Sequence, residues 1–523
     1  MPSPNLTNVP LEILLQITSY LTIADYGAVR LTCKQIEDSL FRSFAHNYFR
    51  KMQFMRTDFS LQALIDISQS RLAPFLKHVV IGTEILDPGV CHIPISADYR
   101  RRTDGRTNVT ANEIKYNKFS TMCADQVVLL STGHDQQMLS EAFSNLNLDV
   151  IGIRSPPVYG PAPRDACTSL GTAKVHRETS IDLKRVGIYY GWGGDARDST
   201  TRANVSCVHN ILSALGKSGL SPKKLETTMG GILLGDDAFI IPSFMQKTLL
   251  PVLSKLEELD IKVDGSSTRY RQIIAPAGES PYKVETYYLR NFLSHLTHLE
   301  RLHLQLSLDY DGFFSWLGSP PSIEDYRGPP GFEPPGSPVF AHLSELTLTK
   351  CTIPVEDMLH IVRKFSRTLR KLSLHQVTLS DGALRLLNHE PRVDIWVGFL
   401  TKLARIGRDI REIHFNDPAQ RSGNAERGLL FRDGEISSPH FSYTGPNMRE
   451  ELESLSQKVK IPESHWYLRS PFASDEEFYE DDFPFNEEDD DFEYDEYDGF
   501  DEFADVIDPE LTEELLMAAA LYP

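Results

Sequence analysis

The stretch "LSELTLTKCTI", Leu343 to Ile353, decides how most of this 523-residue chain is expected to fold. Its apolar residues Leu346 and Leu348 alternate with polar ones, which is the two-residue period of a strand with one buried face. The same phrase, L-x-x-L-x-L, returns 26 residues later in "LRKLSLHQVTL", Leu369 to Leu379. A strand phrase that recurs along a chain indicates repeated units whose strands lie side by side.

Further copies of the phrase extend the pattern in both directions. They are "LEELDI" (Leu256–Ile261), "LERLHL" (Leu299–Leu304) and, with substitutions, "IREIHF" (Ile410–Phe415), with weaker relatives in "LNLDVIGI" at Leu146 and "LKRVGI" at Leu183. Segments with helical patterns separate the copies, so each unit is expected to pair a helix with a strand. The other steps measure 41 to 44 residues. One of them contains the insertion 318–340, whose prolines exclude a helix or a central strand.

The phrase resembles the leucine-rich repeat, L-x-x-L-x-L-x-x-N/C-x-L, with Cys351 at the N/C position. This resemblance implies an irregular leucine-rich-repeat-like solenoid over residues 120–416, within an α+β or α/β repeat fold. The competing interpretation is an all-helical solenoid of about 40-residue repeats, such as HEAT. The alternating strand phrases count against it, and other α/β or α folds stay open.

The strand phrases also indicate a recognition surface. If Leu259, Leu302, Leu346, Leu372 and Ile413 point into the core, the residues that alternate with them form one concave polar face. The candidates for binding a target protein are Asp260, Lys262, Arg301, His303, Gln305, Lys371, His375 and His414. An ordinary solvated sheet face is the alternative for any one of them. Histidines on a ligand-binding surface explain the pattern better than a metal site, so no metal ligands are expected.

Near the N-terminus, "VPLEILLQITSYLTIADYGAVRLTCK" (Val9 to Lys34) predicts two helices with more apolar surface than they can bury between them. Pro10 and Glu12 suit a first helical turn, and Thr22 with Asp25 predicts a second helix start of the capping-box type. The first helix carries two apolar stripes, whereas a surface helix needs one. One stripe comprises Ile13, Ile17, Tyr20 and Leu21, and the other comprises Leu11, Leu14 and Leu15.

Aligned as a whole, this stretch resembles an F-box, the module through which substrate receptors join Skp–cullin ubiquitin ligases. The residues that match without gaps are Pro10, Glu12, Ile13, Leu14, Ile17, Tyr20, Leu21, Asp25, Val29, Arg30, Leu31, Cys33 and Lys34. The resemblance implies a three-helix F-box over residues 5–50, with the second stripe facing the adaptor. It assigns adaptor binding to Val9, Pro10, Glu12, Ile13, Leu14, Ile17, Leu21, Cys33 and Lys34. The alternative is that these helices only cap the repeat array.

The remaining segments are characterised by their composition. We expect a helical linker and loop at 51–119, a poorly defined segment at 417–470 and a disordered acidic tail at 471–523. Asp475 to Glu514 holds 22 acidic residues and no Lys or Arg follows Arg469, so the rest of the chain carries about +2 of the net −20. This near-neutral body gives no indication of nucleic-acid binding. No apolar run reaches the ~18 residues of a membrane span, and six scattered cysteines indicate reduced thiols in the cytoplasm and/or nucleus.

No sequence feature predicts catalysis or a cofactor. The glycine-rich segments 189–198 and 229–239 lack the lysine and hydroxyl residue of a phosphate-binding loop, and the adjacent Asp236 and Asp237 are expected to be solvated. The resemblance implies a non-enzymatic substrate receptor that reaches a cullin–RING ligase through a Skp-type adaptor and binds an unknown protein target. An interaction scaffold without a role in ubiquitination is the main alternative. An enzyme in the body of the chain is the third hypothesis.

Overall fold

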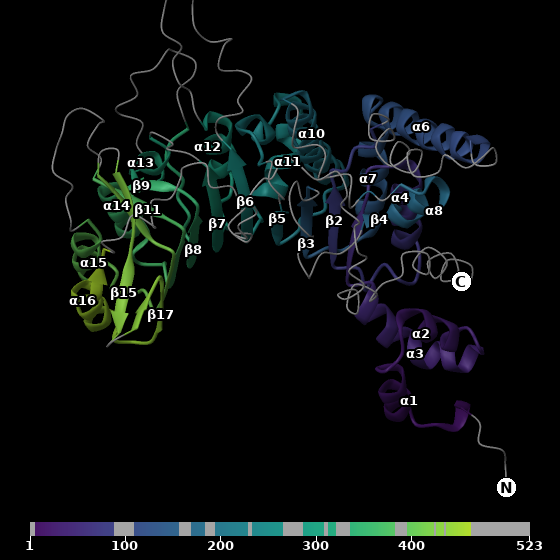
Figure 1. Ribbon diagram of the computed structural model, residues 1–523, viewed down its shortest axis with the longest axis horizontal. Coiled ribbons are helices and arrows are strands. Elements are labelled where there is room, and N and C mark those ends of the chain that lie inside the picture. Colours follow the sequence, from purple (N-terminus) through teal and green to yellow (C-terminus); the bar gives the residue numbers. More distant parts are fainter. Residues whose placement is uncertain are drawn as a thin grey trace, which may run out of the picture.

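The computed structural model describes residues 6–87, 109–155, 169–181, 183, 194–228, 233–264, 286–307, 312–320, 335–381, 395–422, 425–433 and 436–461. Figure 1 shows three short helices at one end of the molecule and, beyond them, an open sheet with its helices. The acidic tail and residues 321–334 of the proline-rich insertion lie outside the described residues. The ends of that insertion are tied together, because the Trp316 indole donates a hydrogen bond of 2.7 Å to the Pro335 carbonyl.

The main sheet has eleven strands in the order β17-β12-β10-β8-β7-β6-β5-β3-β2-β1-β4. All neighbours are parallel except β12 and β17, and β5 to β8 follow one another in chain order. The strands are β1 (Lys51–Phe54), β2 (His78–Gly82), β3 (Val150–Arg154), β4 (Ser169–Leu170), β5 (Lys224–Thr228), β6 (Glu258–Asp264), β7 (Arg301–Ser307), β8 (Glu345–Thr349), β10 (Lys371–His375), β12 (Glu412–Asn416) and β17 (His440–Thr444).

Helices connect the strands and pack against one another. They are α4 (Asp58–Ser68), α6 (Val109–Ser131), α7 (His134–Asn145), α8 (Thr172–Thr179), α10 (Gly194–Ser218), α11 (Ser243–Leu253), α12 (Tyr287–Ser294), α13 (Phe313–Gly318), α14 (Val355–Phe365), α15 (Ile395–Ile406) and α16 (Met448–Lys458), with the 3-10 turn η4 (Asp236–Phe239). Successive members of α4, α7, α10 and α11 contact each other and form one row of helices, and successive members of α13 to α16 form another.

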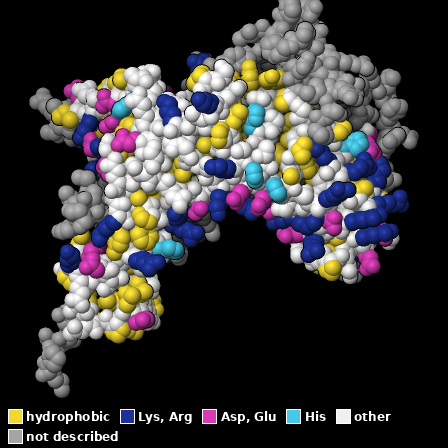
Figure 2. Space-filling model, turned by 180° about the vertical axis from the view of Figure 1, so that it is seen from behind, with side chains coloured by type: hydrophobic (Ala, Val, Ile, Leu, Met, Phe, Trp, Pro, Cys, Tyr) yellow, Lys and Arg dark blue, Asp and Glu magenta, His cyan; other side chains and the backbone are white. Residues whose placement is uncertain are grey.

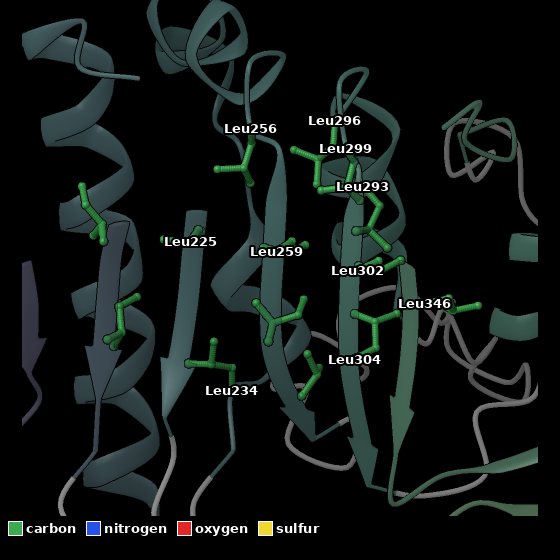
Figure 3. Close-up of a cluster of buried hydrophobic side chains, with 14 of the residues drawn as sticks. Leu225, Leu234, Leu256, Leu259, Leu293, Leu296, Leu299, Leu302, Leu304 and Leu346 are labelled. Carbon is green, nitrogen blue, oxygen red and sulfur yellow. The ribbon is translucent and has the colours of Figure 1, made fainter. Parts of the chain in front are cut away.

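The five main leucine phrases form β6, β7, β8, β10 and β12, as their alternation predicts, and "LNLDVIGI" leads into β3. Residues 184–188 of the weaker phrase "LKRVGI" lie outside the described residues. Leu259, Leu302, Leu346, Leu372 and Ile413 are direct neighbours across five strands, and each is at most 1% exposed. Figure 3 shows three of them in a cluster of buried leucines between strands and helices. Burying one such side chain contributes roughly 2 kcal/mol, so the row is a substantial part of the core. Most of their polar neighbours along each strand are half-buried on the opposite face, and Ser373 is buried.

Two smaller sheets complete the fold. The first has the order β14-β13-β11-β9, formed by β9 (Thr352–Pro354), β11 (Thr378–Ser380), β13 (Ala419–Ser422) and β14 (Ala425–Gly428). The second has the order β16-β15-β18, formed by β15 (Leu430–Asp433), β16 (Ile436–Ser438) and β18 (Val459–Lys460). These sheets and the large parallel one rule out an all-helical solenoid. The fold is mixed α/β with an open, mostly parallel sheet, and its interpretation as a leucine-rich-repeat solenoid stays a prediction.

The structure differs from the sequence-based boundaries in two segments. Residues 51–119 are expected as a helical linker and loop, with a strand-like apolar run "LKHVVIG" at 76–82. That run contains β2, whereas β1 is an additional strand of the main sheet, and α6 begins at Val109. β1 and β2 escape the leucine phrase because residues 52–54 and 79–82 are buried in unbroken runs instead of alternating. Residues 417–461, expected to be poorly defined, contain β13 to β18 and α16.

The same unusual backbone conformation follows three successive strands. Lys350, Gln376 and Asp417 come directly after β8, β10 and β12 and have φ values of 52°, 55° and 46°. The amide of Lys350 donates to the His375 carbonyl at 2.9 Å, and the amide of Gln376 donates to the Asn416 carbonyl at 2.6 Å. Left-handed backbone on a non-glycine residue costs about 1 kcal/mol. The turn after each of these strands therefore repeats at some cost in local strain.

Candidate binding surfaces

The first three helices begin where the capping residues predict. α1 (Leu11–Thr18) follows Pro10 and has Glu12 in its first turn, and α2 (Ile23–Arg30) follows Thr22. The Thr22 hydroxyl oxygen accepts a hydrogen bond from the Asp25 amide at 3.2 Å, which satisfies one of the unpaired donors of the helix start. α3 (Lys34–Tyr48) comes next along the chain. The predicted second helix start at Thr22 is therefore confirmed.

These helices have a small core of their own. Leu14, Tyr26, Leu40 and Phe44 are at most 4% exposed, and the Tyr26 and Phe44 rings meet edge to face with centroids 5.3 Å apart. Aromatic pairs of this geometry add to the stabilisation from burial. α1 packs against α3, and several of its apolar side chains are left outside this core.

A concentrated apolar surface remains on the outside of the three helices. Twelve large apolar side chains are exposed in the described part of the chain, and six of them lie in residues 6–31. These six, which we call the apolar face, are Leu6 (41% exposed), Leu11 (44%), Ile13 (46%), Ile17 (43%), Tyr20 (83%) and Leu31 (52%). Figure 2 shows apolar side chains grouped over the N-terminal helices at the lower left. Exposed apolar side chains concentrated in one region are typical of interaction sites.

The structure divides the predicted adaptor-binding residues into three groups. Pro10, Glu12, Ile13, Ile17 and Lys34 are exposed, Val9, Leu21 and Cys33 are partly buried, and Leu14 is buried. The two stripes are divided differently from the expectation, in which the second stripe faces the adaptor. Ile13, Ile17 and Tyr20 of the first stripe are exposed, and so is Leu11 of the second. Leu14 of the second stripe is in the core, and Leu15 and Leu21 are partly buried. Leu14 therefore holds α1 in place, and it does not lie on the apolar face.

The apolar face also includes residues that the sequence-based site left out. Leu11 and Tyr20 belong to the two apolar stripes of α1, so the helical spacing could have identified them. Leu6 and Leu31 lie outside α1, so the spacing along that helix carries no information about them.

The three helices are joined to the rest of the molecule through a shared core and a charged contact. Phe41 of α3 and Phe75 meet edge to face with centroids 5.7 Å apart. The Glu37 carboxylate accepts two hydrogen bonds of 2.8 Å from Arg30 and also contacts Arg71. The Arg71 guanidinium in turn lies 3.9 Å from the Phe41 ring centroid. The N-terminal helices and the body therefore pack as one unit.

The polar face of the sheet carries a row of alternating charges at the starts of six strands, which we call the charge ladder. Its members are Lys224, Glu258, Arg301, Glu345, Lys371 and Glu412, direct neighbours from β5 to β12. Lys224 lies 2.6 Å from Glu258, and Arg301 lies 2.8 Å from the same carboxylate. Lys371 bridges Glu345 at 3.1 Å and Glu412 at 3.2 Å. Opposite charges on adjacent strands stabilise the pairing, and here they also neutralise one another.

Two histidines lie in the next row of the same face, each held by a carboxylate. His303 contacts Asp260 at 3.1 Å and Thr349 at 3.0 Å, and His414 contacts Glu412 at 2.6 Å and Ser442 at 2.9 Å. His375 lies one row further along the strands. Burial, and then the nearby positive charges of His303, His414 and Lys371, lowers the pKa of His375. Figure 2 shows acidic, basic and histidine side chains together along the underside of the molecule.

All eight residues predicted to bind a target lie on the polar face, and all are half-buried. The structure brings Arg301 and Lys371 into the charge ladder and Asp260, His303 and His414 into the adjoining row. Lys262, Gln305 and His375 follow in the third row. The sequence-based site missed Lys224 and Glu226, because β5 has no leucine phrase. Burial alone would raise the pKa of Glu226, but hydrogen bonds and charges from His78 and Lys224 lower it to about 2.

The adjacent aspartates of the second glycine-rich segment are buried, contrary to the expectation that they are solvated. Asp236 is 1% exposed and Asp237 is 9% exposed. The Asp236 carboxylate accepts hydrogen bonds from the amides of Leu289 at 2.8 Å and Tyr288 at 3.2 Å, at the start of α12. Asp236 therefore caps a helix that lies more than 50 residues further along the chain. Residues 189–193 and 229–232 lie outside the described residues.

Within the described ranges, no three His, Cys, Asp or Glu side chains are grouped as metal ligands would be. The same ranges contain no helix with the length and apolar character to cross a membrane. Residues 6–50 match the family model described as F-box-like. No curated protein matches the chain. The helices that carry the apolar face are thus an F-box-like region, and F-box domains generally bind Skp-type adaptors.

Proposed function

We propose that this chain is the substrate-recognition subunit of an SCF-type E3 ubiquitin ligase, acting in the cytoplasm and/or nucleus. The observation that carries the proposal is the apolar face, six exposed large side chains within the region that matches the F-box-like model. Protein interfaces need a buried apolar centre surrounded by polar groups. Here Ile13, Ile17 and Tyr20 would supply the centre, with exposed Glu12 and Lys34 at its edge.

In this proposal the body of the chain, with its leucine-rich-repeat-like sheet, binds a target protein through the polar face. The half-buried His303, His375 and His414 offer donors and acceptors, while the charge ladder is internally neutralised. The chain is then not an enzyme, because the transfer of ubiquitin belongs to its partners. Its contribution is proximity, since two reactants held by one chain react as if within a single molecule.

The joint between the F-box-like region and the body supports this positioning role. The Glu37 contacts to Arg30 and Arg71 and the Phe41–Phe75 contact span the joint. A receptor that presents its target to a distant active site works best when the connection is stiff, because a flexible one spreads the target over many positions.

Co-expression of the full chain with a Skp-type adaptor, followed by size exclusion, tests the proposal. We expect a stable 1:1 complex for the natural chain. The double variant Ile13→Asp, Ile17→Asp should elute without the adaptor, because two charges would be buried at the centre of the interface. The matched control is Ile114→Asp on α6, which alters an apolar side chain that is 63% exposed elsewhere.

The result against the proposal is equal adaptor binding by the double variant and the control. If the double variant instead lowers the thermal stability of the whole chain, the helices act as a cap for the sheet. A complex that forms but does not recruit a cullin–RING ligase would support the scaffold alternative.

A further inference from the structure

Six exposed arginines gather where α14 and α15 lead into strands β10 and β12. We call them the arginine cluster: Arg363, Arg367, Arg370, Arg405, Arg408 and Arg411. β10 and β12 are parallel neighbours, and the two helices that precede them contact each other, so the helix ends lie at one edge of the sheet. Figure 2 shows Lys and Arg side chains grouped on this lobe, at the right of the view.

The arginine cluster has little internal compensation. Among the described residues, the one ion pair that any of the six forms joins Arg370 to Asp409 at 3.9 Å. Arg363 and Arg405 lie in the last turns of their helices, where a positive charge complements the helix dipole. The dipole effect fades beyond the last turn, so it does not account for the other four. Positive charges concentrated in this way attract an anionic occupant.

The basic side chains of the charge ladder differ from the arginine cluster because they are paired with carboxylates. Its basic side chains Lys224, Arg301 and Lys371 each lie within 3.1 Å of a carboxylate of a neighbouring strand. The charge ladder is therefore satisfied by the chain itself. In the arginine cluster, by contrast, the pair of Arg370 with Asp409 at 3.9 Å is the one ion pair among the described residues.

We propose that the acidic segment Asp475–Glu514 of the same chain occupies the arginine cluster. Its 22 carboxylates and its lack of Lys and Arg make it the electrostatic complement of the cluster. Phe and Tyr residues interleaved with the acids can stack on guanidinium planes, which adds to the attraction. No other stretch of the sequence has a comparable run of carboxylates.

The geometry of the chain favours this occupant over a separate acidic protein. The described residues end at Ile461, just after α16, and α16 packs against α15. Thirteen residues, 462–474, then separate this point from Asp475. Thirteen residues span at most about 45 Å even when fully extended, so the acidic segment is held near the arginine cluster at a high effective concentration. A separate polyanion would have to displace the tethered segment.

The proposal is independent of the adaptor interaction, because it concerns the opposite end of the sheet. It makes the acidic segment an internal competitor for anionic partners of this edge. Binding of this kind depends on salt, since exposed charges are screened within about 3 Å at 1 M ionic strength.

The test uses the full chain with benzoylphenylalanine in place of Tyr494, irradiated at low protein concentration, with crosslinked peptides identified by mass spectrometry. We expect crosslinks within single chains to peptides of residues 355–411. They should be lost at about 1 M salt and in the triple variant Arg363→Glu, Arg367→Glu, Arg408→Glu. The control Arg42→Glu, Lys217→Glu, Lys247→Glu changes the net charge equally at exposed sites on α3, α10 and α11 and should keep the crosslinks.

Comparing the natural sequence at low and high salt keeps the test valid even if the triple variant fails to fold. The proposal is overturned if crosslinks fall outside residues 355–411, arise between chains, or do not form. It is overturned equally if they persist in high salt or in a folded triple variant.

Discussion

Replacing Glu37 by glutamine is expected to destabilise the packing of α2 and α3 in the F-box-like region. The Glu37 carboxylate, with a side chain 13% exposed, accepts two hydrogen bonds from Arg30, whose side chain is 5% exposed. It also contacts Arg71, which belongs to the body of the molecule. Glutamine retains the shape and one acceptor oxygen but removes the negative charge. Arg30 would then keep its positive charge in a buried position without a counter-ion.

The size of the effect can be estimated from these contacts. Removing one partner of a buried ion pair costs about 3–5 kcal/mol. The lower figure applies here, because glutamine keeps one hydrogen bond and the Arg30 guanidinium remains 3.8 Å from the Phe44 ring centroid. A cost of about 3 kcal/mol corresponds to roughly a hundredfold rise in the fraction of molecules whose helices are open.

Hydrogen exchange of the full chain measures this opening directly. Amides of α2 and α3 should exchange roughly a hundredfold faster in Glu37→Gln, while those of β6 to β8 should be unchanged. The control is Glu453→Gln, which removes the partner of Arg449 in an exposed helical pair with side chains 48% and 71% exposed. That change should cost less than about 0.5 kcal/mol. An effect of Glu37→Gln as small as the control would refute the view that this carboxylate holds the joint together.

Two further predictions concern the body of the chain. Burial raises the pKa of Asp236 to about 6 despite its hydrogen bonds from the Leu289 and Tyr288 amides. Because this folded-state pKa lies above the usual 3.8, the stability that Asp236 contributes is present below pH ~4 and is lost as the pH rises through ~6. The test compares the unfolding free energy of the natural chain with that of Asp236→Asn, measured in urea. The value for the natural chain minus that for the variant should fall by up to about 3 kcal/mol from pH 4 to pH 7. A difference that does not depend on pH would contradict this prediction. Gln376→Gly should raise the unfolding free energy by about 1 kcal/mol, because glycine adopts the left-handed backbone at φ 55° without strain. The control Gln376→Ala should give no such gain. Destabilisation by glycine would show that the turn is not strained.

The sequence predicts the strands of the five main leucine phrases, because apolar and polar residues alternate along each phrase. It places Leu259, Leu302, Leu346, Leu372 and Ile413 in the core, and the structure aligns them in one row. The burial of β1 and β2 does not alternate, so β1 could not be found in this way, and β2 is indicated only by its apolar run "LKHVVIG" at 76–82. A strand that is buried on both faces has apolar residues at successive positions, so its sequence shows no two-residue alternation.

For the apolar face, helical spacing allowed only part of the site to be predicted. The spacing identifies two apolar stripes on α1, but both have the same chemical character. Which of them turns inward depends on the packing of Tyr26, Leu40 and Phe44, which are distant in sequence. For the same reason the burial of Asp236 was unpredictable, because the amides that it caps lie 52 and 53 residues away.

The antiparallel strand β17 has a consequence for the behaviour of the molecule in a crowded solution. A parallel sheet grows by adding further strands in the same direction, so an exposed parallel edge invites another copy of the chain to continue the series. β17 ends the series by reversing direction beside β12, and at the other edge β4 is two residues long. At β17 a further copy of the chain could not directly extend the parallel series that ends at β12, and at β4 it would find a strand of two residues to pair with.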